Sequence, residues 1–170
     1  KSYLEEAKER NASAVSLASG YAELYSLRNN LVAATETLKF LTRNKEADFQ
    51  MLTAKGIVEL KKGESSKARD TFIEATAIER NYSRAYSFMA VSHLHAGEPE
   101  IAFRQLELAA KLDPNDPLPH VIASQIYSAL FRPEQATREA ILATGKTDGE
   151  RSFGQLANDQ QGGANVGRRF

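Results

Sequence analysis

A spacing of 34 residues recurs along most of this chain and constrains its fold more than any other feature. Four alanines stand in this register, at Ala34, Ala68, Ala102 and Ala136. A small residue recurs in the same way at Ala22, Gly56, Ala90 and Ser124. A large apolar residue recurs at Leu38, Phe72 and Leu106. A fixed period of this length indicates a repeat architecture, in which each unit buries its apolar face only against its neighbours.

The register divides the chain into four repeats and two end segments. The repeats are expected at 15–48, 49–82, 83–116 and 117–150. Residues 1–14 are expected to hold the second helix of an incomplete repeat, because Leu4 and Ala7 fall in the register of Leu38 and Leu41. Residues 151–170 leave the register and contain four of the ten glycines. We interpret them as a Gly/Asn/Gln-rich tail that cannot build a core alone.

Local signals place helices within each repeat. Gly63 is expected to end a helix in the left-handed conformation, and Asn29 and Gly97 share its register, whereas Phe131 breaks this series. Pro99 and Pro133 suit the first turn of a helix, and Asp116 suits an N-cap. The predicted helices span 2–11, 14–28, 31–43, 48–62, 65–79, 82–96, 99–112, 117–130 and 133–144, with a weak helix near 151–157 and no strand.

Two helices in 34 residues, with small residues at close approaches and a Gly turn, resemble the tetratricopeptide repeat (TPR) family. The third repeat matches best, with Tyr86, Met89, Ala90, His93, Gly97, Ala102, Leu106, Ala109 and Pro114. The second repeat departs from the pattern at Lys55, Glu59 and Arg80. The resemblance covers about 150 of the 170 residues. It implies an all-α, right-handed superhelical solenoid of antiparallel helix pairs that binds a protein or peptide and catalyses nothing.

Composition excludes several classes of function. The chain has 22 basic and 22 acidic residues, so it lacks the positive charge expected of a nucleic-acid binder. Without cysteine it can form no disulfide and no thiolate-ligated metal site. No apolar run approaches the roughly 20 residues that cross a bilayer, so we expect no membrane insertion. The chain starts at Lys1, and we expect it to be part of a longer or processed protein, cytoplasmic or from the periplasm or bacterial envelope.

Motifs that suggest chemistry are better explained structurally. Residues 145–147 read Gly-Lys-Thr, but a phosphate-binding loop needs a strand and a Gly where Ala140 stands. His93 and His95 lie on opposite faces of a predicted helix and have no evident third metal ligand. His93 and His120 occupy packing positions, where they are expected to replace aromatic residues. We therefore predict no catalytic residue, no cofactor and no metal.

Glu59 and Glu64 are close in sequence to Lys61 and Lys62. We expect these four residues to form a solvated surface of mixed charge.

The TPR resemblance implies that the first helices of successive pairs line a concave groove that holds a partner. The residues predicted to bind the partner come from the last three repeats and are Gln50, Thr53, Ile57, Leu60, Lys61, Arg84, Ser87, Val91, Leu94, His95, Leu118, Val121 and Gln125. The middle of this set is apolar and its edge is polar, which is typical of a contact surface. Packing of the same apolar residues within the superhelix is the alternative, and the sequence leaves both open.

Some family members grip an acidic chaperone tail with a clamp of Lys, Asn and Arg. The front of that clamp is occupied here by Ser19, Glu23, Thr53 and Ile57. This set lacks the Asn and the positive charge, which disfavours such a tail as the partner.

We therefore expect a scaffold that binds a partner in the groove, with Gln50, Arg84 and Gln125 setting the register. A structural spacer or assembly module of a larger multi-domain protein, for example a bacterial envelope or secretion component, is the alternative. An enzyme whose catalytic domain lies outside these residues is a third interpretation. Self-association remains open, as does docking of the tail through Phe153, Leu156 and Phe170, either in its own molecule or in a neighbour.

Overall fold

The structure, a computed structural model, describes residues 14–43 and 48–145. This part contains eight α-helices and no strand. The helices are α2 (Ala14–Leu27), α3 (Leu31–Arg43), α4 (Phe49–Lys61), α5 (Ser65–Ile78), α6 (Ser83–His95), α7 (Pro99–Leu112), α8 (Leu118–Ala129) and α9 (Pro133–Ala143). Each end lies within one residue of the expected range, so these predictions are confirmed. The helices expected at 2–11 and 151–157 fall outside the described residues.

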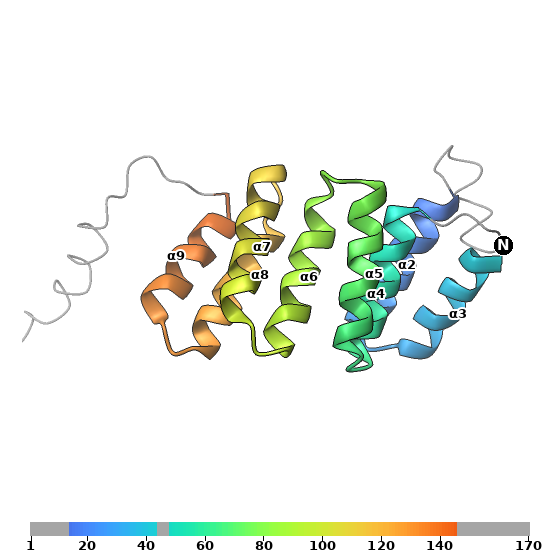
Figure 1. Ribbon diagram of the computed structural model, residues 1–170, viewed down its shortest axis with the longest axis horizontal. Helices are drawn as coiled ribbons and strands as arrows, with labels where there is room; N and C mark the ends of the chain where they lie inside the picture. Colours follow the sequence, from blue (N-terminus) through green and yellow to red (C-terminus); the bar gives the residue numbers. More distant parts are fainter. Residues whose placement is uncertain (1–13, 44–47, 146–170) are drawn as a thin grey trace, which may run out of the picture.

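The helices pack in consecutive antiparallel pairs that follow one another along the longest axis of the molecule (Figure 1). The first helices of successive pairs contact each other, α2 with α4, α4 with α6, and α6 with α8. Over residues 14–43 and 48–145, the backbones of the second helices stay apart, with no Cα atoms of two such helices within 8 Å. The first helices therefore form an inner row and the second helices an outer row. The predicted all-α array of helix pairs is confirmed.

The turn inside each pair has one conformation in all four repeats. Asn29, Gly63, Gly97 and Phe131 have φ values of 58°, 80°, 77° and 55°. The following amide closes each turn; Arg132 N–H, for example, donates to the Tyr127 carbonyl at 2.9 Å. Phe131 thus adopts the conformation expected of Gly, although the sequence indicated a break. A bulky residue in this region costs about 1–2 kcal/mol, which the turn's backbone hydrogen bonds oppose.

The predicted helix starts are confirmed at Pro99 and Pro133, which stand at the first turn of α7 and α9. The α-helical hydrogen bonding of α8 is assigned from Leu118, but Pro117 already has helical φ and ψ. The Asp116 carboxylate accepts from Leu118 N–H at 2.9 Å, which is the contact expected of an N-cap side chain. It also accepts from the Ser83 hydroxyl at 3.1 Å, which links the starts of α6 and α8.

The residues in the 34-residue register are those at which helices approach closely. Ala34, Ala68 and Ala102 are fully buried and Ala136 nearly so. At Gly56 the approach is closest, since a Cβ there would lie 2.5 Å from Cε1 of Phe72. Only a residue without a side chain allows α4 and α5 this separation.

Three apolar clusters follow one another along the array. The first joins α2, α3 and α4 through residues such as Ala22, Leu38 and Leu52. The middle cluster contains Ile57, Leu60, Ala68, Phe72 and Met89. The third contains Ala90, Ala102, Leu106, Ile122, Ala123 and Ile126. Each cluster is shared by adjacent pairs, as expected when a repeat cannot bury its apolar face alone.

Candidate functional site

The predicted groove lies along the inner row. Around α4, most of the side chains predicted to line this groove are buried, so a partner cannot contact them. Thr53 and Ile57 are 1% exposed, and Ser87 is fully buried. The Thr53 hydroxyl donates to the Phe49 carbonyl at 2.7 Å, so its polar atom is satisfied within its own helix. Ile57 and Leu60 belong to the middle apolar cluster. For these two residues the structure favours packing within the array over contact with a partner.

An ion pair joins the inner helices on either side of α4. Arg84 on α6 donates from Nε to Glu23 Oε2 on α2 at 3.1 Å. Its Nη2 forms an ion pair with Glu23 Oε1. The guanidinium also lies over the Phe88 ring, 5.6 Å from its centre. Burial lowers the pKa of Arg84 from its ordinary value, and the nearby Asp116 carboxylate opposes that shift. Arg84, predicted to set a partner's register, is thus held by Glu23.

The inner row remains accessible at its C-terminal half. Val91, Leu94 and Leu118 are half-buried and pack against the third apolar cluster. Val121 is 38% exposed, and Gln125 beside it on α8 is exposed. We call these five residues the α6–α8 surface.

The remaining predicted groove residues lie towards its margins. Gln50 is half-buried, and Lys61 and His95 are exposed. His95 Nδ1 lies 3.0 Å from the Ser65 hydroxyl, so its ring has a hydrogen-bonding neighbour on the outer helix α5.

The other two histidines each meet a glutamate. His93 Nδ1 lies 2.7 Å from Glu98 Oε2, and His120 Nδ1 lies 2.7 Å from Glu139 Oε2. Their side chains are 13% and 23% exposed, so both are partly packed between helices. No group of three or more His, Asp or Glu that could hold a metal occurs within the described residues.

Glu59 is a correction to the sequence analysis, because it lies inside the protein with 4% exposure. Its Oε2 accepts from the Thr71 hydroxyl at 2.7 Å. The Nζ atoms of Lys55 and Lys67 lie 3.9 and 3.7 Å from its Oε1. The buried carboxylate is tolerated because these three side chains surround it.

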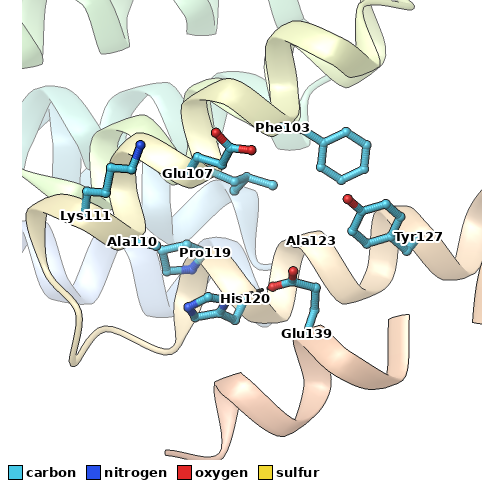
Figure 2. A pocket seen from close by; sticks show the side chains of 10 residues that line it. Phe103, Glu107, Ala110, Lys111, Pro119, His120, Ala123, Tyr127 and Glu139 are labelled. Carbon is cyan, nitrogen blue, oxygen red and sulfur yellow. Dashed lines mark hydrogen bonds and ion pairs between the residues drawn. The ribbon is translucent and has the colours of Figure 1, made fainter. Parts of the chain in front are cut away.

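A groove on the outer side escaped the sequence analysis. It runs between α7 and α9 across α8, has a volume of about 310 Å³ and is shown in Figure 2. It is lined by Phe103, Leu106, Glu107, Ala110, Lys111, Pro119, His120, Ala123, Tyr127 and Glu139. We call it the α7–α9 groove. The only sequence signal was the spacing of Phe103, Glu107 and Lys111, which places them on one helix face.

Among the described helices, none is both long and apolar enough to cross a bilayer. The tail residues Phe153, Leu156 and Phe170 lie outside the described residues, so docking of the tail stays a prediction.

Comparison with known proteins gives a likeness of fold. No protein-family model matches the chain, and no curated protein matches it. A crystal structure of MamA matches with a TM-score of 0.57 and 16% identity, over 86% of each chain. A second MamA structure matches with a TM-score of 0.50 and 19% identity, over 91% of this chain and 83% of that one.

A third solved structure is YrrB, described as a TPR protein with an unusual peptide-binding site. It matches with a TM-score of 0.54 and 17% identity, over 94% of this chain and 80% of that one. At these identities the matches concern the fold, and they confirm the architecture that the repeats predicted.

Proposed function

Because the chain has the tetratricopeptide-repeat fold, we propose that it is a non-catalytic interaction scaffold that holds a partner segment on the α6–α8 surface. One observation carries this proposal: Val121 is exposed beside the half-buried Val91, Leu94 and Leu118, on the inner row of the array. An apolar area with polar neighbours is typical of a contact surface. YrrB, which shares the fold, is described as having a peptide-binding site.

Recognition would rest on a few contacts on a preformed surface. Val121 and Leu118 offer apolar area to one anchor side chain of the partner. The Gln125 amide can both donate and accept, so it can pair with the backbone of an extended segment. Affinity would come from that anchor and not from total area, because few residues dominate such interfaces. Arg84 has no part in this binding, since Glu23 already occupies it.

The test uses peptides selected by the wild-type chain from a phage-displayed random library. Val121→Glu places a charge on the α6–α8 surface and should weaken binding of the selected peptides at least tenfold, about 1.4 kcal/mol. Ile73→Glu is the matched control, because Ile73 is 52% exposed on the outer helix α5. Failure to select any peptide, or equal binding by both variants, would contradict the proposal.

A structural spacer within a larger multi-domain protein, such as a bacterial envelope or secretion component, is the second candidate. Two observations favour it: the Glu23–Arg84 pair joins the first and third repeats, and Thr53, Ile57 and Ser87 are buried. The first three repeats therefore form one packed unit with little accessible inner surface. In that case natural partners would be retained by the Val121→Glu variant, and no peptide would be selected.

A further inference from the structure

The α7–α9 groove has an apolar floor, and its rim carries Lys111 as well as the carboxylates of Glu107 and Glu139. At one end the rings of Phe103 and Tyr127 are stacked, with centres 4.4 Å apart and planes at 23°. Figure 2 shows these rings on one side and the His120–Glu139 contact on the other, with Glu107 projecting from α7. Glu107 is exposed and has no partner among the described residues. The groove can therefore accept an apolar side chain next to a positive charge.

A protrusion with these properties stands on the same molecule. Phe131 in the α8–α9 turn is 92% exposed, the highest value among the large apolar residues of the described part. It holds a left-handed backbone conformation, with φ of 55°, where two other repeats have Gly63 and Gly97. The turn thus presents an aromatic ring to solvent at a cost in stability. Arg132, the next residue, is exposed and has no side-chain partner among the described residues.

We propose that this chain self-associates, with Phe131 and Arg132 of one copy docked in the α7–α9 groove of a second copy. Phe131 would lie on the ring pair of Phe103 and Tyr127, where aromatic contacts add to burial. Arg132 would meet Glu107, so the two side chains at this contact are opposite in charge.

The position of the protrusion favours a closed dimer. The Arg132 amide is hydrogen-bonded to the Tyr127 carbonyl, so Phe131 stands beside the aromatic end of its own groove. Two copies related by a twofold axis near this end can therefore each insert Phe131 into the other, which is a self-complementary arrangement. The α6–α8 surface lies on the inner row and stays open in such a dimer.

The first test is sedimentation velocity of the full chain over a range of concentrations. The wild type should show a reversible monomer–dimer equilibrium, and Phe131→Gly should raise its dissociation constant at least tenfold. Glycine suits the left-handed turn, so unfolding cannot explain that loss. Val32→Ala is the matched control, because Val32 is 76% exposed near the equivalent turn of the first repeat and should leave the equilibrium unchanged.

The second test exchanges the charges. Arg132→Glu and Glu107→Arg should each weaken dimerisation severalfold, since each places like charges in contact. An equimolar mixture of the two variants should dimerise as tightly as the wild type, because both contacts in the mixed dimer then join opposite charges. Only docking of one copy in the other predicts this recovery.

Several results would overturn the proposal. They are a chain that is monomeric at all concentrations, a Phe131→Gly variant that dimerises normally, and a mixture that does not recover. If Phe153→Ser abolished dimerisation and Phe131→Gly did not, the segment that occupies the α7–α9 groove would be the C-terminal one and not the α8–α9 turn. None of these results bears on peptide binding at the α6–α8 surface, so the proposed function is tested separately.

Discussion

Replacing Gly56 with alanine should destabilise this protein, although the same change stabilises most helices. Gly56 lies in α4 against the Phe72 ring of α5. A Cβ at this position would lie 2.5, 2.7 and 2.9 Å from Cε1, Cζ and Cδ1 of that ring, where ordinary contacts are 3.4–4 Å. The ring is fully buried, and the Phe88 ring lies parallel to it with centres 6.4 Å apart. The ring therefore cannot move aside without displacing other packed side chains.

Two opposing terms set the size of the effect. Forcing an extra methyl into a packed core costs about 1–3 kcal/mol. Alanine is better than glycine inside a helix by about 0.8–1.0 kcal/mol. Because three ring carbons are approached at once, we expect the steric term to dominate, with a net loss of about 1–2 kcal/mol in the free energy of unfolding. The measurement is urea unfolding followed by circular dichroism.

Gly20→Ala is the matched control. Gly20 is also helical, in α2, but it is exposed and a Cβ there would meet nothing within 4 Å. This change should therefore stabilise the protein by roughly 0.5–1 kcal/mol. Phe72→Leu should cost less in the Gly56→Ala chain than in the wild type, as a double-mutant cycle would show. Equal stabilisation by both alanine substitutions would refute the reasoning about the contact between α4 and α5.

Three further predictions concern buried polar groups. Burial, and to a smaller extent the carboxylates of Asp116 and Asp48, raises the pKa of Tyr82 above its ordinary 10.0. As pH rises, the unfolded chain therefore loses the Tyr82 proton at a lower pH than the folded protein does. Stability should therefore fall as pH rises above about 10, and Tyr82→Phe should flatten this part of a urea-midpoint profile; an unchanged slope would contradict the assignment. Arg84→Leu leaves the Glu23 carboxylate unpaired, with its side chain only 15% exposed. The free energy of unfolding should fall by about 1–2 kcal/mol. This is less than for a fully buried pair, because the Arg84 side chain is 34% exposed. Adding Glu23→Gln should recover part of that loss in the same unfolding assay, and no recovery would argue against the pair. Thr71→Val removes the hydroxyl that donates to Glu59 and should cost about 1.5 kcal/mol or more, whereas a neutral result in thermal unfolding would show that the carboxylate does not depend on it.

The sequence analysis succeeded wherever the signal was local. Gly63, Pro99 and Pro133 mark helix ends through their own backbone chemistry, so the helix limits agree with the structure. Phe131 was misleading, because its side chain argues against a turn that its backbone nevertheless adopts. Glu59 was misplaced at the surface, since nothing in its sequence neighbourhood indicates that Thr71 would lie beside it.

By itself the sequence determined that this protein is an array of helix pairs, because the 34-residue register repeats contacts that each pair makes only with its neighbours. Which inner-row side chains remain exposed was decided by the tertiary structure. Glu23 and Arg84 are 61 residues apart in the chain, and they meet because of how α2, α4 and α6 pack. The α7–α9 groove likewise depends on the separation of two outer helices, a distance that side-chain packing sets and that no periodicity encodes.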